Sequence, residues 1–178
     1  MKNTLLAIAF AISTAAIAQT PVVKDIKANM TQGMQPGVEV FIAGANEDQV
    51  EDAIKDNTKK FKGKDRKIKK SDERFIDDAE IKELSPNTID IHYLIKEESN
   101  GVTLQLFFNM GLTFLSKDLD SQKYDFMSRL AGKIAMDATQ LNYDELIKEQ
   151  EKVLEDFMDD NKDASNNISK AQNDIEKA

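Results

Sequence analysis

Asn100 and Gly101 form the local signal that most restricts the fold of this chain. Asn-Gly is the pair best suited to a type I′ turn, and here it separates two runs of alternating apolar residues. A two-residue loop predicts that Ser99 pairs with Val102. The apolar residues then face one another in three pairs: Ile95 with Leu106, Tyr93 with Phe108, and Ile91 with Met110. Pattern and turn therefore agree on an antiparallel hairpin.

Further strands and two helices are expected from the same kinds of pattern. Alternation predicts strands at Val22–Met30, Val38–Ala43, around Ile68, Phe75–Leu84 and Thr88–Glu97. The first two strands are separated by Gln35-Pro36-Gly37, which is typical of a turn. Asn46 and Gln49 resemble a capping box, so a helix should begin there and end at Gly63, with Val50, Ala53, Ile54 and Phe61 on its apolar face. A second helix is expected from Ser121 to Leu141, with an apolar stripe of Tyr124, Met127, Leu130, Ile134 and Ala138.

The Ser85-Pro86-Asn87 turn allows two registers for the strands beside it. A two-residue loop would place Glu83 opposite Asp90, which repel each other. A three-residue loop places Lys82 opposite Asp90 instead, and is the register we expect. It pairs Ile81 with Ile91 and Ala79 with Tyr93, and leaves His92 on the outer face between Glu80 and Asn109, with Leu94 paired to Phe107 there.

The order of elements after Gly37 is strand, helix, four strands, helix. This order resembles the TATA-binding-protein-like architecture, and the resemblance covers about residues 37–141. It implies an α+β fold: an antiparallel sheet with two helices packed on one face, here with an added N-terminal strand. The resemblance is one of order alone and implies nothing about DNA. We expect the domain to span residues 22–141.

Residues 1–18 have the pattern of a secretory leader. Lys2 precedes an apolar run, and Ala16-Ile17-Ala18 is a small-x-small cleavage pattern, so Gln19 is the expected mature N-terminus. The chain has no cysteine, which excludes disulfides and a lipid-modified cysteine. Together these features predict a bacterial protein that is periplasmic or secreted, with no membrane span after cleavage. The net charge of −8 opposes nucleic acid as a partner.

The C-terminal tail, residues 142–178, is acidic and carries a heptad pattern. Ten residues recur at alternating spacings of four and three, and all but the polar Gln150 and Asn161 are apolar or small: Tyr143, Ile147, Gln150, Leu154, Phe157, Asn161, Ala164, Ile168, Ala171 and Ile175. The pattern favours a helix that packs back on the domain and frays at its end. The alternative is self-association through residues 142–178 as a coiled coil.

A run of cations is the most visible candidate binding site. It consists of Lys59, Lys60, Lys62, Lys64, Arg66, Lys67, Lys69, Lys70 and Arg74. Such a strip suits a polyanion, for example a lipid phosphate or an acidic polysaccharide. The competing interpretation is a solvated helix end followed by an edge strand that lysines protect from aggregation.

His92 is the single histidine, and on the expected outer face it has one carboxylate, Glu80, beside it. One histidine and one carboxylate are too few ligands for zinc, and no nucleophile accompanies them. We expect no catalytic residue, no metal site and no cofactor.

Several stretches are similar to uncharacterised exported proteins of Bacteroidetes-type bacteria. They are residues 37–42, 51–56, 59–64 and 75–81, within a similarity that covers about half of the mature chain. That family has no assigned activity, so the resemblance implies no functional residue. The leading hypothesis is an exported, non-enzymatic interaction or scaffolding protein with an unknown envelope partner. The alternatives are an anion-binding module that uses the basic strip, and an enzyme that uses His92.

Overall fold

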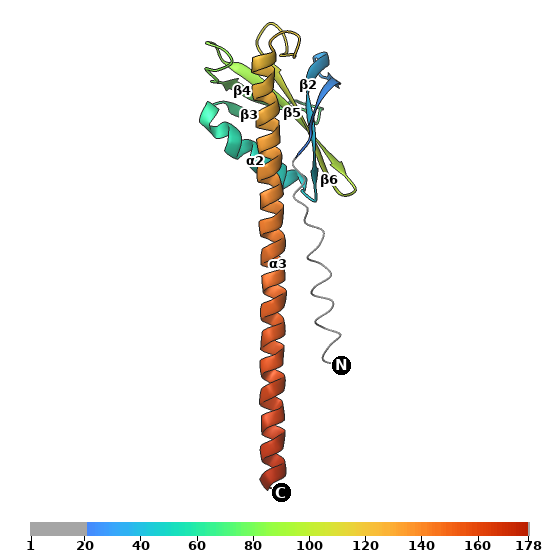
Figure 1. Cartoon of the computed structure of the whole chain (residues 1–178), viewed down its shortest axis with the longest axis vertical. Helices are drawn as coiled ribbons and strands as arrows, with labels where there is room; N and C mark the ends of the chain where they lie inside the picture. Colours follow the sequence, from blue (N-terminus) through green and yellow to red (C-terminus); the bar gives the residue numbers. More distant parts are fainter. Residues whose placement is uncertain (1–20, 178) are drawn as a thin grey trace.

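The computed structural model describes residues 21–177 and shows an α+β fold, as predicted (Figure 1). Its six antiparallel strands lie in the order β1-β2-β6-β5-β4-β3. Their bounds are β1 Val23–Met30, β2 Gly33–Ala43, β3 Lys64–Lys67, β4 Arg74–Ala79, β5 Ile89–Glu98 and β6 Gly101–Asn109. The helices are α2 Glu47–Thr58, which continues as the short 3₁₀ helix η1 Lys59–Phe61, and α3 Ser121–Lys177. The predicted order of strand, helix, four strands and helix after Gly37 is confirmed. The expected leader, residues 1–18, lies outside the described residues.

The β5–β6 hairpin is confirmed, but its predicted register is wrong by two residues. Glu98 pairs with Gly101, so the loop is Ser99–Asn100, and Tyr93 pairs with Leu106. Gly101 pairs with Ala43 of β2 as well as with Glu98, and β2 approaches it so closely that a Cβ at this position would collide with the Ile42 carbonyl oxygen. An even shift leaves each side chain on its expected face, so the apolar pairing across the core survives.

Two other predicted turns are also wrong. Gln35-Pro36-Gly37 lies inside β2, and the chain reverses instead at residues 31–32, followed by Gly33 with φ +90°. Pro36 fits because β2 pairs there with β1 alone, since its pairing with β6 begins at Val38. The second is the three-residue loop predicted at Ser85-Pro86-Asn87: Ile76 rather than Ile81 pairs with Ile91, and Ala79 pairs with Ile89 rather than Tyr93. A bulge before Ala79 ends β4 early. The longer loop that follows buries Ile81 and Leu84 in the core.

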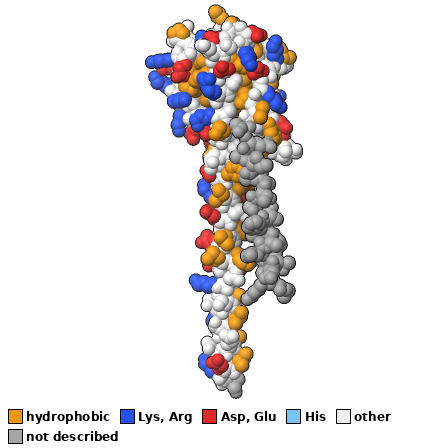
Figure 2. Space-filling model, viewed as in Figure 1, with side chains coloured by type: hydrophobic (Ala, Val, Ile, Leu, Met, Phe, Trp, Pro, Cys, Tyr) orange, Lys and Arg blue, Asp and Glu red, His pale blue; other side chains and the backbone are white. Residues whose placement is uncertain are grey.

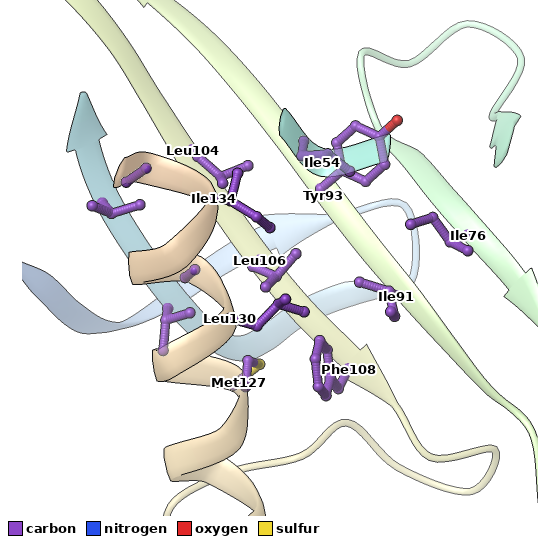
Figure 3. Close-up of a cluster of buried hydrophobic side chains, with 14 of the residues drawn as sticks. Ile54, Ile76, Ile91, Tyr93, Leu104, Leu106, Phe108, Met127, Leu130 and Ile134 are labelled. Atoms are coloured by element: carbon purple, nitrogen blue, oxygen red, sulfur yellow. The ribbon is translucent and has the colours of Figure 1, made fainter. Parts of the chain in front are cut away.

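The helices cover one face of the sheet, and their side chains form the main core. The predicted capping box of Asn46 and Gln49 is confirmed at the start of α2. The helix ends before Gly63, because Lys62 adopts the left-handed conformation (φ 62°) that closes it. The predicted stripe of α3 is buried, and Figure 3 shows Met127, Leu130 and Ile134 over the apolar side chains of β6.

A second cluster lies on the outer face of the sheet. Phe107 of β6 is fully buried there with Met30 and Phe114, and Ile26, Ala28 and Leu94 pack around them. The predicted pairing of Leu94 with Phe107 is wrong: Leu94 pairs with Gln105, and Phe107 with His92. Strand β1 and the segment after β6 cover this face.

Helix α3 runs on through residue 142 to Lys177 without a break. Its last buried side chain is Ala138, and every residue from Tyr143 to Lys177 is exposed. The tail is therefore helical as expected. Glu145 near its start accepts a hydrogen bond of 2.6 Å from the Gln49 side chain of α2, and beyond it the helix leaves the domain. Figure 1 shows it projecting well beyond the sheet.

Gly37 and Gly132 should respond oppositely to replacement by alanine. A Cβ at Gly37 would overlap the Phe107 ring and lie 2.6 Å from the Leu106 carbonyl oxygen. We expect Gly37→Ala to lower the free energy of unfolding by about 1–3 kcal/mol. Gly132 lies within α3, where a Cβ would make ordinary contact with Val23 at 3.6 Å, so Gly132→Ala should raise it by about 0.5–1 kcal/mol. Urea unfolding followed by circular dichroism measures both changes, and a neutral Gly37→Ala would contradict this account of the outer cluster.

Candidate functional site

The nine cations of the basic strip run from the end of α2 through β3 to the start of β4. Strand β3 is at the edge of the sheet and all of its residues are exposed. Four of the nine cations already have carboxylate partners: Lys59 with Asp56, Lys62 with Glu80, Arg66 with Asp77, and Arg74 with both Glu51 and Asp65. The strip is thus less positive than its sequence suggests.

Arg74 is a structural member of the strip. Its side chain is only 16% exposed and bridges Glu51 of α2 to Asp65 of β3. Its guanidinium also lies 5.5 Å from the centre of the Tyr93 ring, whose hydroxyl donates to Asp65 at 3.1 Å. Burial, with the Asp65 carboxylate beside it, raises the pKa of the Tyr93 hydroxyl far above its ordinary value. Arg74 therefore ties α2 to the sheet.

The other five cations are exposed and have no ion pair among residues 21–177: Lys60, Lys64, Lys67, Lys69 and Lys70. Lys69 and Lys70 form the turn between β3 and β4. In Figure 2 basic side chains gather on the side of the head where Figure 1 places α2 and β3. These five lysines are the part of the predicted site that remains available to an anion.

A cleft of about 540 Å³ opens between α2 and the β3–β5 edge. Its lining carries both signs of charge in equal number: the cations Lys55, Lys59 and Arg74, and the carboxylates Glu51, Asp52 and Asp65. An anion that entered the cleft would meet these carboxylates, so the cleft does not extend the basic strip into a pocket for anions.

His92 lies in a buried pair that sequence analysis missed. Its side chain is 3% exposed, and Nδ1 lies 2.7 Å from Oε1 of Glu73, whose side chain is 1% exposed. The other oxygen of Glu73 accepts a hydrogen bond of 2.8 Å from the Thr31 backbone N–H. The expectation that His92 lies on a solvated face between Glu80 and Asn109 is wrong. Its neighbours across the sheet are Phe75 and Phe107.

The pair is enclosed by aromatic rings. The Phe75 ring stacks on the imidazole with a centroid separation of 5.1 Å, and Phe114 packs against it at 5.4 Å. Nε2 of His92 is buried without a hydrogen-bond partner among the described residues. A group that exchanges protons with a substrate must reach it, and this imidazole is closed off. The geometry suits a structural role, in which Glu73 joins the β1–β2 turn to β5.

Three carboxylates converge at the bulge of β4. Oxygen atoms of Asp77, Asp78 and Asp90 lie within 4.8 Å of one another. From the sequence, Asp77 and Asp78 should point to opposite faces of a regular strand. The bulge and the left-handed backbone of Asp78 (φ 58°) bring them together instead. Oxygen ligands of this kind suit a hard cation, but Arg66 and the Thr88 hydroxyl already bond to this group.

No protein family, no curated protein and no solved structure matches the chain. Within residues 21–177, no helix combines the length and the apolar character needed to cross a membrane.

Removing Glu73 should destabilise the fold strongly. Glu73→Ala leaves the Thr31 N–H and the His92 imidazole buried without their acceptor, so we expect a loss of about 3 kcal/mol in the free energy of unfolding. Glu73→Gln should lose less, because its amide can accept from Thr31 and donate to Nδ1. The matched control is Glu80→Ala, which removes an exposed carboxylate and should change little. Urea unfolding at neutral pH compares the three variants, and equal stabilities would show that the pair is not structural.

Proposed function

We propose that the chain is an exported, non-enzymatic interaction or scaffolding protein of the bacterial envelope. The observation that carries the proposal is the exposed half of α3. Its apolar side chains form a stripe that the domain does not cover (Figure 2): Leu146, Ile147, Val153, Leu154, Phe157 and Met158 are 44–64% exposed. Exposed stripes of this length are typical of surfaces that bind another protein.

Two further features support the proposal. The leader pattern of residues 1–18 directs the chain to the envelope. The imidazole of His92, the most versatile proton-transfer group at neutral pH, is enclosed by Phe75, Phe114 and Glu73 and serves packing.

Cross-linking in native envelopes, followed by affinity capture and mass spectrometry, tests the proposal. The tagged wild-type chain should recover specific protein cross-links, and its N-terminal peptide should begin at Gln19. Leu154→Gln should lose at least half of these cross-links, because it places an amide in the apolar stripe. The control is Leu112→Gln, which changes a fully exposed leucine outside the helix. A full-length chain in the cytoplasm, or cross-links indifferent to Leu154, would contradict the proposal.

The second candidate is a binding module for an anionic envelope ligand, favoured by the five lysines without ion pairs. Lys64→Gln, Lys67→Gln and Lys69→Gln combined should reduce retention on heparin and lower its salt dependence, while stability changes little because exposed charges contribute on the order of 0–1 kcal/mol. We expect the wild-type binding to be weak and lost at physiological salt, where screening acts over ~8 Å.

Lys59→Gln with Lys62→Gln is the matched control, because both lysines already have carboxylate partners. Tight wild-type binding at physiological salt that the triple variant abolishes would place this second function first.

A further inference from the structure

A seven-residue repeat runs along the exposed half of α3 and contains the apolar stripe. Ile147, Leu154, Asn161, Ile168 and Ile175 occupy the a positions, and Tyr143, Gln150, Phe157, Ala164 and Ala171 occupy the d positions. One d position further upstream, Met136, is also apolar and is 59% exposed, although the a position between it and Tyr143 is Gln140. A repeat of this period keeps one seam facing a partner helix along its whole length.

The residues at the a positions influence how many helices a coiled coil contains. Three of the five a residues are isoleucine, which is compatible with two parallel strands, and a single asparagine at a fixes register and oligomeric state. Asn161 is the central one of the five a residues, and its side chain now donates to the Phe157 carbonyl at 2.9 Å. In a parallel, in-register pair it would face its own copy, where the two amides can bond to each other. In an antiparallel pair it would face a d residue, and the amide would lose that partner.

The distribution of charge also permits a second copy, although the tail has a net charge of −6. In a parallel pair each g residue meets the e residue five positions later in the partner helix. These pairs are Leu146 with Glu151, Val153 with Met158, Asp160 with Ser165, and Asn167 with Gln172. None of the four pairs two like charges, and one of them is apolar.

The domain does not obstruct the seam. Ala138 is the last side chain that α3 buries against the sheet, and Ile147 follows it by nine residues. At 3.6 residues per turn this separation is about two and a half turns, so Ile147 lies on the opposite side of the helix. In two copies joined along the seam, each domain would therefore lie on the side of its helix that faces away from the partner helix.

We propose that α3 pairs with α3 of a second copy of this chain, as a parallel two-stranded coiled coil in register at Asn161. This inference rests on the proposed interaction function and names its partner. Each helix offers about 54 Å of tail to the other.

The absence of cysteine permits a direct test by disulfide trapping. The chain is produced from Gln19 with Gln150→Cys, a d position, or with Lys152→Cys, an outward f position as the matched control. After mild oxidation, Gln150→Cys should form a covalent dimer that reduction dissociates, and Lys152→Cys should form no covalent dimer. Light scattering of the wild-type chain should give twice the monomer mass, and Leu154→Gln should shift the mass toward the monomer where Leu112→Gln does not.

Other outcomes overturn the inference. A dimer mass without trapping at position 150 would mean a different orientation or register, and a mass of three or four chains would exclude two strands. A monomer at every concentration would also overturn it. If that monomer still gave Leu154-dependent cross-links to another envelope protein, the proposed function would stand and only the identity of the partner would fail. If those cross-links were also absent, both would fail.

Discussion

The burial of β6 on both faces is the constraint on which the rest of the fold depends. Residues 101–108 of this strand are all buried. Its even-numbered side chains, such as Leu104 and Leu106, require the cover of α3, and Phe107 requires cover on the outer face. In a sheet with one solvated face, the helices alone would be enough to cover the apolar side chains. This chain must also use β1 and the segment after β6.

Closure of the outer face explains the buried polar pair. Glu73 precedes β4, yet it bonds to the turn between β1 and β2 and to His92 of β5. It therefore connects parts of the sheet that β6 and β5 separate in strand order. The packing of Phe107 is non-directional, whereas the two hydrogen bonds of Glu73 are directional. These bonds therefore fix the position of the β1–β2 turn relative to β5.

Helix α3 has two environments along one continuous element. Its first half is held by the sheet and by α2, where Asn57 donates to Asp137 at 2.7 Å. Its second half keeps the same helical geometry with an apolar stripe turned away from the domain. A helix gains most of its stability from packing, but the apolar stripe of the second half has no partner among residues 21–141. The interaction function proposed above follows from this division.

Local signals in the sequence determined the elements, the faces of the strands and the helix start. The capping box at Asn46 and the stripe from Tyr124 to Ala138 involve residues within a few turns of one another, so spacing alone reveals them. The tertiary structure decided the registers. The close approach of Ile42 restricts position 101 to glycine, and burial in the core, not the local turn sequence, sets the position of Ile81. It also decided the position of His92, whose partner Glu73 lies outside any strand. Periodicity reports which face a side chain takes, whereas what covers that face depends on contacts between residues far apart in the chain.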